Sequence, residues 1–392
     1  MTVPGGPRAR RAGRPTRQLP TAPTTPDGPA RATPSPTAAE GVVPPATIMP
    51  PYRLPAEHFL AALGWLALGA LGLVSLAPEL ATGAYLTPRA AAVTHCFTLG
   101  WVTTSIFGAL YQIYPVALGV GAHSTRIGHL TFWMLQAGIV CLVAGAWWWN
   151  PNLLGPGWLL LFLATIALRV NLVARARGAT RAPIVGKYAT AAVVSLVLAL
   201  AVIGVSIGSF AGWWRSDRTA VLIAHAHLAA VGFATLIAIG VGGKLLPMFL
   251  YARDLPEWPL RWIGPLVGAV ALGLLLLLAS DPDPRIAAAY GLLGIVGWLT
   301  LFVAGVYHRI LPFLTWLERF SSKVGAPGVP KVTDLTKPRL TWTTHALLAV
   351  GAAALGLAVF AGSPTGAWVG AAVFALGALT LLGTYLDIVR RR

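Results

Sequence analysis

Long apolar runs constrain this chain more than any other feature of its sequence. A helix that crosses a bilayer needs about 20 mostly apolar residues. Ten segments meet this requirement: 57–77, 90–115, 128–148, 154–173, 187–209, 219–249, 259–279, 286–314, 340–361 and 365–389. Only 10% of the 392 residues are charged, whereas soluble globular domains carry about 25%. The sequence therefore predicts an all-α, polytopic membrane helix bundle and excludes a water-soluble fold.

The distribution of positive charge predicts the orientation of this bundle. If the ten spans alternate in direction, all but four of the 29 Lys and Arg residues fall on one side, together with both termini. The four exceptions are Arg89, Arg215, Arg218 and Arg285. Since positive loops stay in the cytoplasm, we expect both termini to be cytoplasmic, in the plasma membrane of a prokaryote. This asymmetry also accounts for the net charge of +17, so no nucleic-acid partner is expected, and membrane lipid is the expected surrounding.

The N-terminal region differs in composition from the rest of the chain. Residues 1–52 are rich in Pro and Arg, with Thr, Ala and Gly between them. Such a segment buries too little apolar surface to fold by itself. It also lacks the apolar core that follows the charges of a secretory signal peptide. We expect a disordered basic cytoplasmic tail over 1–52 and a transmembrane domain over 53–392.

Three of the expected spans, all running from the outer to the inner side, share the pattern Gly-aromatic-x6-Gly-x6-Pro. The three copies are Gly100-Trp101 with Gly108 and Pro115, Gly232-Phe233 with Gly240 and Pro247, and Gly297-Trp298 with Gly305 and Pro312. The glycines allow either close approach of neighbouring helices or room for the edge of a macrocycle. Membrane proteins with repeated helices usually place their site between the repeats.

Histidines stand five residues before the first glycine in two of the three copies. These are His95 and His227, and Leu292 takes the position in the third copy. Equivalent positions place both imidazoles at one depth, roughly 8–12 Å below the outer boundary at 1.5 Å rise per residue. A buried imidazole needs a partner, and no Asp or Glu lies at mid-membrane. An iron atom bound from both sides would satisfy both rings, as would separate hydrogen bonds to backbone or hydroxyl groups.

The remaining histidines leave further alternatives open. His225 projects about 200° around the helix from His227, so it serves either a second site or a solvated position at the membrane interface. Five others are expected in the cytoplasmic half, where they form either a metal or second haem site or ordinary interfacial positions. They are His58, His123, His129, His308 and His345.

These motifs resemble a known family. The run His225-Ala226-His227, followed by Gly232-Phe233, resembles the haem-ligand helix of subunit I of the haem-copper oxidase superfamily, most closely that of C-type cytochrome c oxidase. His95 with Gly100-Trp101 resembles another ligand helix of the same subunit. The resemblance implies that His95 and His227 are the axial pair of a haem b, and that His225 is the ligand of a second haem. The chain has no His-His pair, which that family uses to bind copper, so copper is not expected.

The resulting functional prediction is a membrane haem b protein that transfers electrons or binds a diatomic gas such as NO or oxygen. Oxidoreductase turnover is left open. Its expected partners are a respiratory-chain subunit, a cytochrome or a quinol donor. A membrane transporter that uses the histidines for a metal ion or a proton relay is the alternative, and an assembly partner of a respiratory complex is the third hypothesis. Tightly bound haem would distinguish the haem b protein from the transporter.

Overall fold

The computed structural model describes Thr2 and residues 51–118, 124–176, 183–210, 212–249 and 283–390. Every regular element in these ranges is a helix, and none is a strand. The predicted tail, apart from its last two residues and Thr2, lies outside the described residues. So does the predicted span 259–279.

Within the described ranges, nine helical spans are long and apolar enough to cross a membrane. Three of them are composite, with a central π-helix: α2–η1–α3, α7–η2–α8 and α10–η3–α11. The other six are α1 (Arg53–Ala81), α4 (Thr125–Trp147), α5 (Pro151–Ala176), α6 (Pro183–Phe210), α12 (Pro338–Phe360) and α13 (Pro364–Arg390). Two short 3-10 helices, η4 (Ser321–Lys323) and η5 (Val332–Leu335), lie between α11 and α12. These nine spans match nine of the ten segments expected from the sequence, and the chain has the features of a multi-pass membrane protein.

Proline and short polar side chains determine where several helices begin. Thr87 precedes Pro88 at the start of α2, and its hydroxyl accepts a hydrogen bond from the Ala90 amide at 3.1 Å. Asp283 precedes α10 in the same way and accepts from the Arg285 amide at 2.9 Å. Proline suits the first turn of a helix because the missing amide has no partner there in any case.

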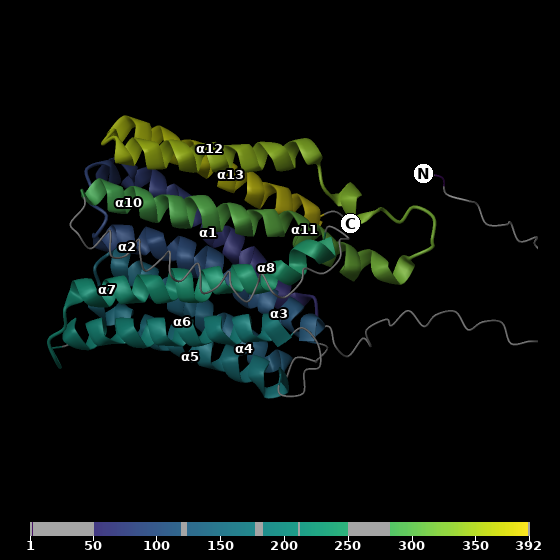
Figure 1. Cartoon of the computed structure of the whole chain (residues 1–392), viewed down its shortest axis with the longest axis horizontal. Coiled ribbons are helices and arrows are strands. Elements are labelled where there is room, and N and C mark those ends of the chain that lie inside the picture. Colours follow the sequence, from purple (N-terminus) through teal and green to yellow (C-terminus); the bar gives the residue numbers. More distant parts are fainter. Residues whose placement is uncertain are drawn as a thin grey trace, which may run out of the picture. The chain divides into compact units, whose positions relative to one another are not determined.

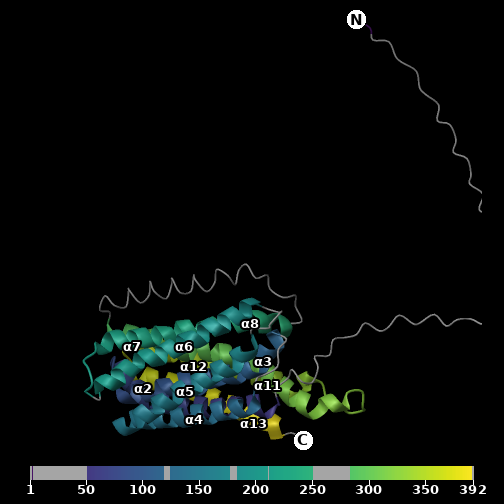
Figure 2. The same cartoon turned by 90° about the horizontal axis from the view of Figure 1, so that it is seen from below.

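The three composite spans run in one direction. In Figure 1 and Figure 2, α2 and α7 lie at the left and their continuations α3 and α8 at the right, and Figure 1 shows the same order for α10 and α11. Helices α12 and α13 pack against each other, as do α4 and α5, while α1 contacts α3 and α13. The three copies of the repeat are therefore parallel helices, as the sequence pattern predicts.

Each copy of the repeat changes from α-helix to π-helix at the same register. The π segments are η1 (Cys96–Thr103), η2 (Leu228–Thr235) and η3 (Leu293–Leu299). They begin directly after the histidine position of each copy, which ends α2 (Pro88–His95), α7 (Arg218–His227) and α10 (Pro284–Leu292). The spans then continue as α3 (Thr104–Leu118), α8 (Leu236–Phe249) and α11 (Thr300–Phe320). The sequence repeat is thus a structural repeat.

A threonine three residues after the first glycine stabilises each π segment. The hydroxyls of Thr103, Thr235 and Thr300 donate to the carbonyls five residues earlier, at 2.8, 2.9 and 3.0 Å. A hydroxyl can supply this extra bond where the wider turn leaves a carbonyl poorly paired. The full motif is therefore Gly-aromatic-x-Thr-x4-Gly-x6-Pro.

The surface and the interior of the bundle both fit a lipid environment. Large apolar side chains point outward on several spans, with Trp133 at 65%, Leu357 at 67% and Leu376 at 55% exposure. The largest fully buried side chains include Trp101 and Tyr307, whose ring centroids lie 4.7 Å apart. An apolar exterior around a packed aromatic interior is what contact with membrane lipid requires.

Candidate functional site

The candidate site lies where α2 faces α7 and α6. His95 is the last residue of α2, and His225 is two residues before the end of α7. Their ring centroids lie 6.3 Å apart, and the two ring planes differ by 30°. The structure therefore brings together two of the three predicted site histidines, from two different copies of the repeat.

Each of these imidazoles has one nitrogen held by a backbone carbonyl. Nδ1 of His95 lies 2.7 Å from the carbonyl oxygen of Ala91, one turn earlier in α2. Nδ1 of His225 lies 3.0 Å from the carbonyl oxygen of Ala199, across the helix interface in α6. A proton on Nδ1 is donated in both contacts, which leaves the lone pair on each Nε2. Histidines that bind metals are commonly oriented in this way.

His227 has a different environment from His225. Its Nδ1 lies 2.8 Å from the carbonyl oxygen of Ile223 on its own helix, and its side chain is partly exposed. Among the described residues, the ring contacts of His95 include His225 and not His227. This agrees with the expectation that the two histidines of α7 serve different directions, and it makes His225 the imidazole opposite His95.

The ring separation fits two imidazoles on opposite sides of one metal ion. With metal–nitrogen bonds of about 2.0–2.1 Å, two Nε2 ligands in line place their ring centroids roughly 6 Å apart. The observed 6.3 Å between His95 and His225 matches this value. Both rings are partly buried, and their free nitrogens suit iron, zinc or copper. The centroid separation and the two free nitrogens are therefore compatible with one metal ion held between His95 and His225.

The surroundings of α7 and η2 are less tightly packed than those of the first copy. In the span Pro88–Pro115, 78% of the central apolar stretch is buried inside the bundle. In the span Ala220–Gly243, only 22% of the corresponding stretch is buried. Residues 228–232 are all partly exposed. Leu228 and Val231 of η2 are thus partly exposed, whereas Phe233 and Ala234 of the same segment are buried.

The glycines of the first two copies serve close helix packing. A Cβ atom on Gly100 would lie 2.5 Å from Cβ of Trp65 in α1, and one on Gly232 would lie 2.8 Å from Cβ of Ser195 in α6. Gly108 likewise faces His58 of α1. In each case the neighbour belongs to a helix that comes earlier in the chain. Of the two roles expected for these glycines, close approach of helices is the one observed at these three positions.

The histidines expected in the cytoplasmic half do not form one group. His129 pairs with Glu57, Nδ1 to carboxylate oxygen, at 2.6 Å, and the His58 ring packs on Phe132 at 4.9 Å. His308 and His345 form a separate pair with ring centroids 4.7 Å apart. His123 lies outside the described residues. No cluster of three or more His, Cys, Asp or Glu residues suited to a metal ion occurs in the described ranges.

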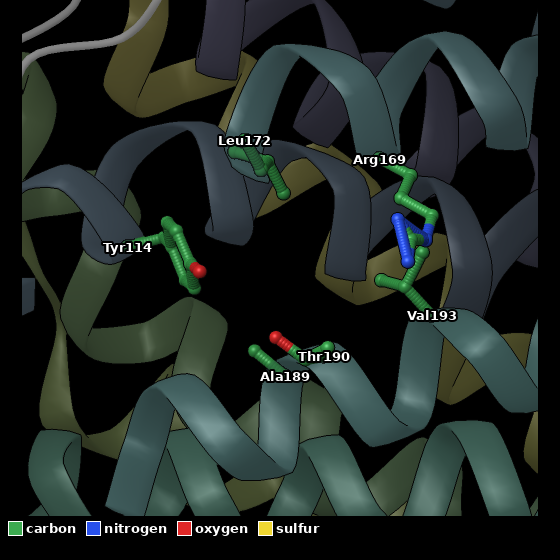
Figure 3. A pocket seen from close by; sticks show the side chains of 6 residues that line it. All are labelled: Tyr114, Arg169, Leu172, Ala189, Thr190 and Val193. Atoms are coloured by element: carbon green, nitrogen blue, oxygen red, sulfur yellow. The ribbon is translucent and has the colours of Figure 1, made fainter. Parts of the chain in front are cut away.

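Two cavities among the described residues are lined by neither His95 nor His225. An apolar groove of about 560 Å3 runs between α1, α2 and α4, and it is lined by Cys96, Trp65 and the half-exposed Leu68 and Leu71. Cys96 thus faces this groove, as expected of a small apolar side chain. A second cavity of about 10 Å3, roughly enough for one water, lies between α3, α5 and α6. Figure 3 shows its lining: Tyr114, Arg169, Leu172, Ala189, Thr190 and Val193.

Comparison with known proteins identifies no relative from which the role of these histidines could be inferred. No protein family matches the chain, and no curated protein matches it at a significant level. The resemblance to subunit I of the haem-copper oxidases rests on the quoted motifs alone and stays a prediction.

Proposed function

We propose that this chain is an integral membrane haem b protein whose haem is held between the first two copies of the repeat. His95 and a histidine of helix α7 would hold the haem iron. The observation that carries the proposal is the 6.3 Å separation of two imidazole rings whose Nδ1 atoms are both held by backbone carbonyls. A haem bound in this way supplies one-electron transfer, and a haem with an open position binds a diatomic gas.

Different observations favour each of the two histidines of α7 as the partner of His95. The family resemblance favours His227, with His225 as ligand of a second haem. The ring geometry favours His225, because it lies opposite His95 and carries the cross-helix bond to Ala199. We propose that His225 would hold the haem iron together with His95, and that His227 would be available to a second haem.

The protein's own residues have three tasks in this proposal. The carbonyls of Ala91 and Ala199 fix the tautomer and the direction of both imidazoles, and such contacts raise the basicity of a ligand nitrogen. The partly exposed apolar side chains of η2, Leu228 and Val231 among them, would help to exclude water from a bound haem. Electron transfer to or from a respiratory-chain subunit, a cytochrome or a quinol is then the favoured role, since the sequence has no His-His pair of the kind that the resembled family uses for oxygen reduction.

The uneven distribution of Lys and Arg supports a location for the histidine pair within the membrane. With all but four of the Lys and Arg residues on one side, we propose that both termini lie in the cytoplasm of a prokaryote and that the histidine pair lies in the outer half of the plasma membrane. A haem at this depth is placed to exchange electrons with a carrier on the outer side or with quinol in the bilayer.

A reduced-minus-oxidised optical spectrum of the detergent-purified protein tests the proposal. We expect b-type Soret and α bands that are lost in His95→Ala and His225→Ala and kept in His129→Ala, whose ring pairs with Glu57. If His227→Ala abolishes the bands while His225→Ala keeps them, the axial pair is the one implied by the family resemblance. A protein that stays colourless after expression with ample haem refutes haem binding, and transport of a metal ion becomes the function to test.

A further inference from the structure

A second pair of imidazoles joins α11 and α12. His308 of α11 and His345 of α12 have ring centroids 4.7 Å apart, with ring planes that differ by 42°. A Cβ atom on Gly305 would lie 3.9 Å from Nε2 of His345. Because residues three apart share one face of a helix, Nε2 of His345 points at the face of α11 that carries His308.

Both rings are oriented through Nδ1. Nδ1 of His345 lies 3.1 Å from the carbonyl oxygen of Thr341, one turn earlier in α12. Nδ1 of His308 lies 3.2 Å from the hydroxyl oxygen of Tyr385 in α13, and Tyr385 is fully buried. When each Nδ1 carries the proton and donates it, both Nε2 lone pairs are free, as in histidines that bind metals.

One of these free nitrogens lacks a hydrogen-bond partner among the described residues. Nε2 of His308 is buried, and no hydrogen-bond partner for it occurs in the described structure. A buried polar atom without a partner costs about 1–3 kcal/mol, so proteins rarely keep one without a ligand or water. The His345 ring beside it is partly exposed, which gives access from the surface.

We propose that His308 and His345 bind a divalent metal ion of the zinc class through their two Nε2 atoms, with water completing the coordination. Two imidazoles at a near-tetrahedral angle, with bonds of about 2.0–2.1 Å, place their centroids roughly 5 Å apart. The observed 4.7 Å matches this adjacent arrangement, just as 6.3 Å at His95 and His225 matches the opposed one. The pair is thus a second site, distinct from the proposed haem and independent of it.

The chemistry of the two imidazole ligands limits which metal ions can bind at this site. Neutral imidazole favours zinc, cobalt, nickel and copper over magnesium and calcium, which prefer oxygen ligands. Two protein ligands leave coordination positions for water or a further group, unlike the closed four-ligand sites that stabilise folds. Because Tyr385 lies behind His308, its hydroxyl orients the ligand and does not itself occupy the metal position.

Titration with Co2+ tests this site, since cobalt replaces zinc and absorbs visible light. The protein is purified in detergent with a tag that lacks histidine, treated with a chelator and titrated with Co2+ alone. Spectra are recorded as differences, so that any haem bands cancel. We expect one Co2+ per chain with d–d absorption of a four- or five-coordinate ion, displaced by Zn2+. His308→Gln and His345→Gln should each weaken binding at least tenfold, and His129→Gln should not.

Two outcomes overturn the inference. One is the absence of a d–d band in the wild-type protein, which means that water alone satisfies Nε2 of His308. The other is equal Co2+ affinity in wild type and in both variants, which places the ion elsewhere. A melting temperature for each variant shows whether lost binding reflects a lost fold. Haem content is read separately from the optical spectrum, so failure at His308 and His345 leaves the haem proposal standing.

Discussion

Substitution of Gly100 by alanine tests the close contact between η1 and α1. The added Cβ would lie 2.5 Å from both Cβ and Cγ of Trp65. Because the Cβ of Trp65 is fixed to the backbone of α1, a change of rotamer cannot relieve the collision, and α1 itself must move. Overpacking of this kind costs about 1–3 kcal/mol. Alanine in place of glycine returns up to about 1 kcal/mol of helix propensity, which offsets part of the loss.

Gly297 provides a matched control for this change. It holds the same register in η3, and a Cβ there meets no heavy atom of the described residues within 4 Å. Gly297→Ala gains the same propensity without the collision, so the two variants should differ in unfolding free energy by about 1–3 kcal/mol. Thermal unfolding in detergent should show Gly100→Ala melting several degrees below Gly297→Ala. Equal melting temperatures would refute the argument that Gly100 is required by the approach of Trp65.

Two further predictions concern hydrogen bonds, one set between side chains of different helices inside the bundle and the other at an exposed ion pair. Gln136 accepts from the Trp65 indole at 2.8 Å and donates to the Thr104 hydroxyl at 3.3 Å, so Gln136→Leu should lower stability by about 1–2 kcal/mol, read as a fall in melting temperature. At the surface, the Arg285 guanidinium lowers the pKa of Asp283 to about 2. Since this pKa lies below the unfolded value of about 3.9, the carboxylate's contribution is present above pH 4 and lost as pH falls through about 2. The melting difference between wild type and Asp283→Asn should therefore stay constant from pH 8 to 5 and shrink near pH 2.

Much of the fold follows from the sequence because the bilayer imposes simple rules. Apolar length predicted the nine spans that the structure describes, and the spacing of Gly100, Gly108 and their counterparts predicted three parallel helices. The π segments were not predicted, although a signal was present. Thr103, Thr235 and Thr300 stand at one register, and their bonds to carbonyls five residues earlier mark the change of helix type.

The candidate site was only partly predictable, for a physical reason. Sequence places His95 and His227 at a common depth, with His225 two residues earlier, but the choice of partner depends on the rotation of α7 about its own axis. That rotation is set by packing against α6, where Ser195 faces Gly232 and the Ala199 carbonyl faces His225. The pairing of His308 with His345 likewise depends on how α11 and α12 pack, which no spacing within one helix reveals.

The third copy of the repeat shows that the π segments do not depend on histidine. Leu292 takes the histidine position there, yet η3 begins directly after it, as η1 does after His95. The change of helix type is therefore a property of the glycine and threonine pattern, and a ligand is added to it only where histidine is present. For this reason His95→Ala should keep its fold, with a side chain smaller than the leucine of the third copy. Loss of haem bands in that variant, with an unchanged melting temperature of the haem-free protein, would then report on ligation and not on unfolding.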